Sequence, residues 1–232
     1  MAAVKNRHPV RDTILARRST RTGFVAREVD VALIEDIIRC GLAAPSSKNG
    51  EPWRFHVVTD RSLLCAIADA MESAEEIDTY VPHDPTTGAP HRDLVSSVAE
   101  SAQVLRDVPL GIIIENRAPF SGGRDVLLAA EPVARKRGIF GYALEFAGLG
   151  AALQNLWLAA IEAGLVGTFM GDIAIAERWI QEQLGLDGEL LGVLALGYGS
   201  TPPNAPRQSR DPRERSLVRW FPPTNGSASG SS

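Results

Sequence analysis

Hydrophobic residues recur along the chain at two spacings, one typical of helices and the other of strands. Asp30 is a good N-cap residue for a helix in which apolar side chains follow at helical spacing, at Ile34, Ile37, Ile38 and Leu42. Strands are predicted at 53–59, 109–114 and 190–197. Shorter helices are predicted at 10–18, 63–71, 94–105 and 175–184. Strands separated by helices indicate an α/β or α+β layered domain, with the strand order left open.

Two of these segments are expected to be deeply buried. The run PLGIII at 109–114 is uninterrupted by polar residues, which is typical of a strand covered on both faces. The segment from Phe140 to Ala163 is apolar almost all round, whereas a solvent-facing helix has a polar face. Its small residues would let another helix approach closely: Gly148, Gly150, Ala151 and Ala152. A dimer interface and a central core helix both explain this pattern.

Other segments are predicted to lie outside the regular framework. Residues 78–93 are too rich in Pro, Gly, Thr and Asp for regular structure, and we expect a mobile surface excursion there. Residues 115–139, which include FSGGRD, look like a second excursion. After Thr201 the chain is Pro-rich and basic and closes with the flexible NGSASGSS. We find no internal repeat and expect one domain over 1–215, followed by a tail at 216–232.

Composition narrows the class of protein. The chain has 232 residues, 44% hydrophobic and 22% charged, which is typical of a globular protein with a substantial core. A net charge of -4 disfavours a general polyanion binder. Cys40 and Cys65 lie in apolar helical patterns, so buried thiols are favoured over a disulfide or metal pair. There is neither a signal-peptide pattern nor a run of the roughly 20 apolar residues that span a bilayer. A cytoplasmic location is therefore predicted.

Two polar segments in the first quarter of the chain are candidates for ligand binding. ARRSTRTGF, residues 16–24, interleaves arginines with hydroxyls at a helix end, which suits one phosphate group, although a solvated basic face explains it better when it is taken alone. APSSKNGEPWRFHVV, residues 44–58, places a small polar loop directly before a strand of buried type. That loop could donate to a polar ligand, or could simply terminate the preceding helix.

Two further candidates lie towards the C-terminus. In GTFMGD, residues 167–172, Gly171 would allow a backbone N–H to approach a flat ligand, although an ordinary strand end explains the segment better when it is taken alone. APRQSRDP, residues 205–212, supplies Arg207, Gln208 and Arg210, or is an exposed basic tail. Neither segment is decisive by itself.

Several common catalytic motifs are missing. The sequence has no GxGxxG after a strand, no P-loop, no GxSxG and no HExxH. Its four histidines are scattered, at His8, His56, His83 and His91, and no CxxC accompanies them. A Rossmann nucleotide site, a serine hydrolase and a metal centre are therefore not supported.

Taken together, the order and spacing of these segments resemble the flavin-dependent nitroreductase family. The residues that carry the resemblance are RRSTRTGF, PSSKNGEPWRF, LQNLWLAA, TFMGD and SRDP, which extend over roughly residues 10–215. Glu51 replaces the family's usual Gln before Pro52, and Gly23 adds a residue before Phe24. The Asn and Lys that many members carry after the first strand have no obvious counterpart in MESAEEIDTYVPHD.

The resemblance implies an α+β fold with a three-layer arrangement of helices and sheet. It also implies an interlocked homodimer with an FMN molecule at each of two sites between the subunits. The FMN phosphate would be held by Arg17, Arg18, Ser19 and Arg210, with Arg207 and Gln208 nearby, and Arg21 would lie beside the pyrimidine edge. The other subunit would contribute Pro45, Ser46, Ser47 and Asn49. Met170 and Gly171 would present backbone N–H to flavin N5.

The implied activity is an NADH- or NADPH-dependent reduction of electron-poor acceptors such as nitroaromatics or quinones. The reduced nicotinamide would reduce the flavin and leave before the acceptor binds, and neither a side-chain nucleophile nor a metal is needed. The alternatives are a flavin dehydrogenase or oxidase that takes hydride from a dedicated metabolite, and a non-catalytic FMN-binding protein. A flavin-fragmenting enzyme is disfavoured because that branch usually has Asp where this chain has Ser19. Both excursions would shape the pocket mouth.

Overall fold

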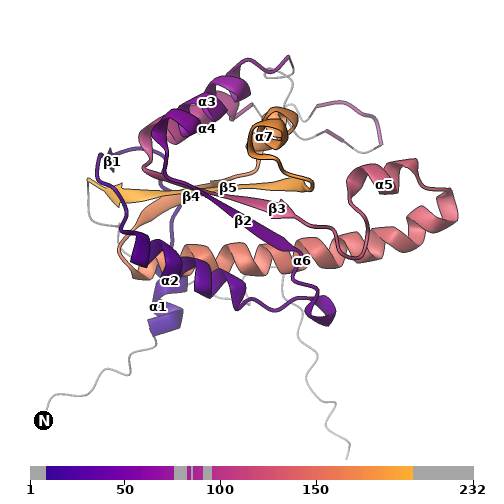
Figure 1. Cartoon of the computed structure of the whole chain (residues 1–232), viewed down its shortest axis with the longest axis horizontal. Coiled ribbons are helices and arrows are strands. Elements are labelled where there is room, and N and C mark those ends of the chain that lie inside the picture. Colours follow the sequence, from indigo (N-terminus) through magenta and orange to yellow (C-terminus); the bar gives the residue numbers. More distant parts are fainter. Residues whose placement is uncertain (1–8, 76–82, 85, 91–95, 201–232) are drawn as a thin grey trace, which may run out of the picture.

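The computed structural model describes residues 9–75, 83–84, 86–90 and 96–200. Its strands are β1 (Phe24–Val25), β2 (Trp53–Val58), β3 (Leu110–Asn116), β4 (Val166–Met170) and β5 (Glu189–Gly199). Its α-helices are α1 (Pro9–Ala16), α2 (Val31–Leu42), α3 (Arg61–Glu72), α4 (Val98–Asp107), α5 (Arg124–Ala129), α6 (Pro132–Glu162) and α7 (Glu177–Leu184). Two 3₁₀ segments, η1 (Ser47–Asn49) and η3 (Asp172–Ala176), lie next to strands. Figure 1 shows helices on both sides of one sheet.

The sheet is built around its longest strand, β5. Strand order is β1-β5-β3-β2, β4 also pairs with β5, and every pairing of the named strands is antiparallel. The register between β3 and β5 shifts after Ile114, which faces Gly192. Gly192 has a φ of 153°, and a Cβ there would come within 2.6 Å of the Met170 carbonyl oxygen. This glycine therefore lets the end of β4 pack closely against the bulge in β5.

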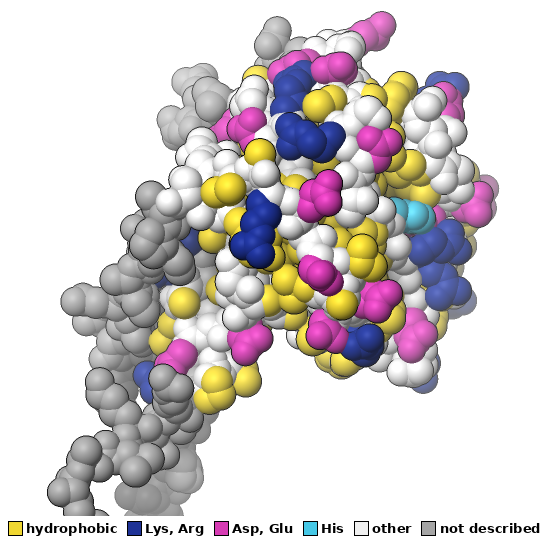
Figure 2. Space-filling view, turned by 60° about the vertical axis from the view of Figure 1, so that its left-hand side comes forward, with side chains coloured by type: hydrophobic (Ala, Val, Ile, Leu, Met, Phe, Trp, Pro, Cys, Tyr) yellow, Lys and Arg dark blue, Asp and Glu magenta, His cyan; other side chains and the backbone are white. Residues whose placement is uncertain are grey.

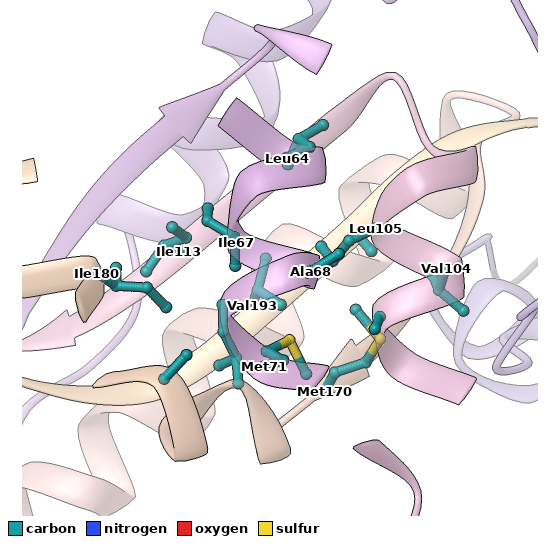
Figure 3. Close-up of a cluster of buried hydrophobic side chains, with 14 of the residues drawn as sticks. Leu64, Ile67, Ala68, Met71, Val104, Leu105, Ile113, Met170, Ile180 and Val193 are labelled. Atoms are coloured by element: carbon teal, nitrogen blue, oxygen red, sulfur yellow. The ribbon is translucent and has the colours of Figure 1, made fainter. Parts of the chain in front are cut away.

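Two hydrophobic cores cover the two faces of the sheet. One is formed with α3, α4, η3 and α7, as Figure 3 shows, and the other with α2 and α6. Ile113 belongs to the first core, whereas Ile112 and Ile114 belong to the second. The buried two-faced strand predicted from PLGIII is thus confirmed. The layered α+β architecture is confirmed as well, because helices cover both faces of an antiparallel sheet.

The long helix α6 begins earlier than the sequence pattern predicted. It starts at Pro132, in the first helical turn, and not at Phe140. Arg135 donates to the carbonyls of Leu127, Leu128 and Ala130, which ties the end of α5 to the first turns of α6. Segment 115–139 therefore contains the end of β3, α5 and the start of α6. The basic first turns lack the apolar pattern on which the predicted boundary depended.

The middle of α6 lies in the core, as predicted. Leu149, Ala152 and Leu156 are completely buried between α2 and the sheet. By length and composition α6 is also apolar enough to cross a membrane, but a buried core helix meets the same criteria. Burial explains why its sequence is apolar over so much of its circumference.

Most of the remaining boundaries agree with the predictions within a few residues. The Asp30 side chain accepts the Ala32 N–H and caps α2, which ends at Leu42. The predicted helix at 175–184 begins as η3 and continues as α7, and of the helix predicted at 94–105 the structure describes α4 from Val98. Of the excursion at 78–93, the structure describes a turn around Asp84 closed by a bridge between His83 and Pro90. The tail after Thr201 lies outside the described residues.

The prediction of two buried thiols is wrong for Cys40. Cys40 is exposed, whereas Cys65 is half-buried. On α2 the buried positions are Ile34, Ile37 and Gly41, and Cys40 lies on another side of the helix. Helical spacing alone did not distinguish the edge of the apolar face from its centre.

Candidate functional site

The arginine-rich segment leaves α1 and runs beside β4. Arg18 Nη1 donates to the carbonyl oxygens of Leu15 and Arg17, each at 2.8 Å, and so covers the open carbonyl end of α1. The Thr20 N–H then donates to the Gly167 carbonyl at 2.9 Å. These contacts hold Ser19, which is exposed, close to the first residues of β4.

Arg17 stacks on the ring of Trp157, a contact that the sequence did not predict. Its guanidinium carbon lies 4.3 Å from the ring centroid of Trp157, a residue of α6 that is 8% exposed. Stacking engages the face of a guanidinium and directs its N–H groups outwards in the plane, the geometry used for carboxylate and phosphate. Trp157 gave no signal in the sequence, because a tryptophan in an apolar helix is expected in any core.

Arg21 forms an ion pair with an acidic residue of α4 on the surface. Its Nε lies 3.5 Å from Glu100 Oε2 of α4, and both side chains are well exposed. Exposed pairs of this kind contribute at most about 1 kcal/mol, so the contact would be exchanged readily for a ligand. The implied place of Arg21 beside a flavin ring stays a prediction.

The turn from β4 into η3 contains Met170 and Gly171, whose backbone N–H groups were predicted to face the flavin. The Met170 side chain is 4% exposed and packs with α3 and α4, as Figure 3 shows. A Cβ on Gly171 would lie no closer than 3.8 Å to any other atom, the nearest being the Leu191 carbonyl oxygen. Such a Cβ would make ordinary van der Waals contact with the described residues outside its immediate chain neighbours, so none of them requires glycine at 171.

Directly after this glycine comes a buried acid that the predicted site did not include. Asp172 Oδ2 accepts hydrogen bonds from the hydroxyls of Ser97 and Ser101, both at 2.7 Å. These serines belong to the N-terminal end of α4, so Asp172 ties the β4–η3 turn to that helix. The pattern GTFMGD contained Asp172, but nothing in the sequence indicated which side of the turn its carboxyl group faces.

The polar loop after α2 has a strained backbone. Lys48, Asn49 and Glu51 have φ values of 47°, 54° and 44°, a region that non-glycine residues rarely adopt. The Glu51 N–H donates to Ser46 Oγ at 3.1 Å, and the Phe120 ring lies where a Gly50 side chain would be. Pro45 and Asn49 are exposed, whereas Ser46 and Ser47 are half-buried. Local strain maintained by specific contacts is typical of ligand-binding loops.

The two N-terminal candidate segments lie at different points along α6. Ser46 packs beside Gly148, whereas Arg17 stacks on Trp157, nine residues further on. At 1.5 Å per residue the two positions are about 14 Å apart along the helix axis. One protomer thus does not bring the polar loop to the arginine segment. The fourth candidate, with Arg207, Gln208 and Arg210, lies outside the described residues.

A buried network of carboxylates holds the end of β3 and the loop that follows it. Glu145 of α6 is completely buried and accepts the N–H groups of Phe120 and Ser121, at 2.7 and 2.9 Å. Asn116 Nδ2 donates to both Glu145 and Glu189. A cleft of about 380 Å³ opens beside this network, with Arg54, Glu115, Arg124 and Glu189 in its lining. Sequence reasoning assigned this cleft no role.

Deprotonation of Tyr142 at alkaline pH should destabilise this network. Its hydroxyl donates to Glu189 Oε2 at 3.0 Å, and burial together with that carboxylate raises the pKa of Tyr142 to about 12. Since the unfolded phenol has a pKa near 10, this stabilisation is complete below pH 10 and is lost between about pH 10 and 12. We expect unfolding measured from pH 8 to 12 to show a steeper alkaline loss for wild type than for Tyr142→Phe. Parallel curves would contradict this.

With this geometry in place, comparisons with known proteins identify the class. The sequence model of the nitroreductase family matches residues 14–198, and the chain belongs to that family. A nitrobenzene nitroreductase of Ectopseudomonas oleovorans is 31% identical over 71 residues, which make up 29% of this chain. The match spans 31% of that relative's length.

Solved structures share the fold over nearly the whole chain. A BluB-like flavoprotein from Clostridium difficile 630 has a TM-score of 0.66 and 25% identity, covering 92% of this chain and 99% of that one. The NADPH:FMN oxidoreductase from Vibrio harveyi, complexed with NAD⁺, has a TM-score of 0.62 and 19% identity, covering 94% and 80%. Together with the family match, they confirm the predicted nitroreductase-like fold.

Proposed function

We propose that this protein is an FMN-dependent NAD(P)H oxidoreductase that reduces nitroaromatics, quinones or similar electron-poor acceptors in two separate half-reactions. The observation that carries the proposal is the β4–η3 turn, where the nearest described atom to a Cβ on Gly171, outside its chain neighbours, would lie at 3.8 Å, so that a glycine is not required there by the packing of these residues. Family membership supports an oxidoreductase. FMN and a nicotinamide are supported by the NADPH:FMN oxidoreductase neighbour and its bound NAD⁺. The nitrobenzene nitroreductase relative supports the acceptor class.

The distance between the two ends of β4 matches the length of an FMN molecule in an extended conformation. Thr20 pairs with Gly167 at one end, and Gly171 lies four residues further along. At about 3.3 Å per residue these points are about 13 Å apart. In our assignment Arg17 and Ser19 bind the phosphate, and the backbone at Met170 and Gly171 faces the ring. Bound FMN supplies the hydride chemistry, while this chain's residues bind it, orient it and place charge around it.

We further propose that the functional unit is a homodimer. Within one protomer the polar loop lies about 14 Å from Trp157 along α6, and the family resemblance implies that the loop facing each flavin comes from the other subunit. Large apolar side chains are exposed on α1, α2 and α6, among them Val10, Leu42, Ile139 and Phe140. Figure 2 shows hydrophobic side chains gathered on one face between scattered acidic and basic ones. Association would remove such surface from water.

Light scattering tests the assembly. We expect the mass of a dimer at every concentration at which the protein binds FMN, because the site would be incomplete in one chain. Phe140→Glu places a charge on the exposed apolar part of α6 and should weaken the dimer if this surface is buried by the partner. A flavin-loaded wild-type monomer would contradict the proposal.

The absorbance spectrum and turnover of the purified protein test the function itself. We expect flavin bands, release of FMN on denaturation, and bleaching by NADH or NADPH without oxygen that reverses when a nitroaromatic or quinone is added. Bleaching only by a different reduced metabolite would favour a dedicated dehydrogenase, and flavin without any turnover would favour a binding protein. A colourless protein that cannot be reconstituted with FMN would exclude all three.

Arginine variants test the phosphate site. If Arg17 and Arg210 bind the phosphate, each alanine variant leaves a doubly charged group short of a partner, at a cost of about 1.5–3 kcal/mol. Flavin titration should then show roughly a ten- to hundredfold loss of FMN affinity. Arg215→Ala, which alters a tail arginine outside the motif, should bind FMN like wild type. Equal affinities in all three variants would mean that these arginines are solvated surface residues.

A further inference from the structure

Asp172 places an incompletely satisfied carboxyl group in the protein interior. The residue is 8% exposed, and Ser97 and Ser101 both donate to its Oδ2. Its Oδ1 is buried, and no hydrogen-bond donor lies within reach of it in the part of the chain that the structure describes. Among those residues no basic side chain forms an ion pair with Asp172. A buried carboxyl group left without a cation and with one unbonded oxygen calls for an explanation.

A purely structural role explains only half of this arrangement. The two serine hydroxyls connect η3 to the first turns of α4, and this connection needs only Oδ2. The hydroxyls and the N-terminal end of α4 favour a negative charge on the carboxyl group, but they do not neutralise it. The charge is therefore retained close to the turn, where little water can screen it.

We propose that Asp172 sets the reduction potential of the flavin by holding a negative charge next to the β4–η3 turn. This inference rests on the proposed function, since it requires the flavin ring to lie at Gly171. Reduction transfers two electrons and one proton, as hydride from NADH or NADPH, and leaves NAD⁺ or NADP⁺. The flavin thereby gains one net negative charge, which a nearby carboxylate opposes. Asp172 thus lowers the potential and favours passing the electrons on to an acceptor.

Asp172 is suited to act through its charge and not through contact. It follows Gly171 directly in the chain, so it lies one residue from the backbone assigned to the ring. Its carboxyl group is turned towards α4 and is closed to solvent. Other acids of the region are paired, since Glu100 contacts Arg21 and Glu177 binds Arg124. Their charges are partly balanced locally, whereas that of Asp172 is not.

The midpoint potential of bound FMN, measured by anaerobic equilibration with a reference dye, tests this role. Asp172→Asn keeps the shape and removes the charge. We expect about a tenfold shift of the equilibrium towards the reduced flavin, which is about 30 mV more positive for a two-electron couple. Asp36→Asn removes a carboxylate from the exposed surface of α2 and should leave the potential unchanged. Ser101→Ala removes a donor but keeps the charge, so it should not raise the potential.

The possible outcomes separate this inference from the proposed function. Wild-type protein that binds no FMN would reject the function before any variant is compared. Wild type that binds FMN, with an unchanged potential in Asp172→Asn, would leave Asp172 with a structural role only. An equal rise in Ser101→Ala would also overturn the proposal, because geometry and not charge would then be responsible. Asp172→Ser, which keeps a hydroxyl near Ser97 and Ser101, gives the same comparison if the asparagine variant does not fold.

Discussion

Replacing Glu145 with alanine should lower the free energy of unfolding by about 3–5 kcal/mol, a large part of the stability of a typical domain. The Glu145 carboxylate is completely buried and accepts hydrogen bonds from the Phe120 N–H, the Ser121 N–H and the Ser121 hydroxyl. Alanine would leave these donors without an acceptor, at about 1–3 kcal/mol each before any water enters. Urea unfolding of the FMN-free protein measures the loss.

Two other substitutions on the same helix make this result specific. Glu145→Gln keeps one acceptor oxygen for the backbone N–H groups but turns an amide donor towards other donors, so its loss should be smaller. Glu162→Ala removes an exposed acid at the end of α6 and should change stability by no more than about 0.5 kcal/mol. If Glu145→Ala were as stable as Glu162→Ala, the network would contribute little to folding.

The effect of Glu145 should extend to the proposed site. Glu145 holds the backbone at Phe120, and the Phe120 ring packs against Gly50 in the polar loop. The strained conformation at Lys48 and Asn49 depends on such contacts to persist. We therefore also expect this loop to become more mobile, which faster hydrogen exchange of the backbone amides of residues 46–51 in FMN-free protein would detect.

Replacing Gly171 with leucine should reduce FMN affinity by at least about a hundredfold, or about 2.7 kcal/mol. Gly171 has a φ of -86°, which any residue adopts, and the nearest atoms to a Cβ there are 3.8 and 3.9 Å away. A Cβ at this position therefore fits against the described residues, and the rest of the leucine side chain would occupy the space assigned to the flavin. Flavin titration measures the affinity, and thermal unfolding of the FMN-free protein checks that folding is unchanged.

A size series at the same position provides the control. Gly171→Ala adds one methyl group and should lose much less affinity than the leucine variant, with equal stability of the FMN-free proteins. Full FMN binding by Gly171→Leu would show that the ring does not lie at this turn. Loss of folding in the leucine variant would instead show that the turn accepts a Cβ but no larger side chain, and the alanine variant would then decide the test.

Local sequence patterns were sufficient for most elements of the fold, but not for β1, β4 and α5. The apolar run before Glu115 predicts a strand covered on both faces, because no polar side chain is left to face water. Asp30 predicts the start of α2 because an N-cap side chain bonds within its own turn. The start of α6 was misplaced because Arg135 acts on carbonyls at the end of α5, a contact between two elements.

For the candidate site too, some features follow from the sequence and others only from the tertiary structure. By itself the sequence determined a layered domain of helices and strands and, through its motifs, the nitroreductase family to which the chain belongs, which implied the α+β class. Only the tertiary structure decided that Arg17 stacks on Trp157, that Asp172 is buried against α4, and that the polar loop lies far along α6 from Arg17. The spacing and the types of residues along the chain reflect the contacts that a residue makes with its neighbours in the sequence. Contacts between distant segments depend on how the layers pack, which no local pattern records.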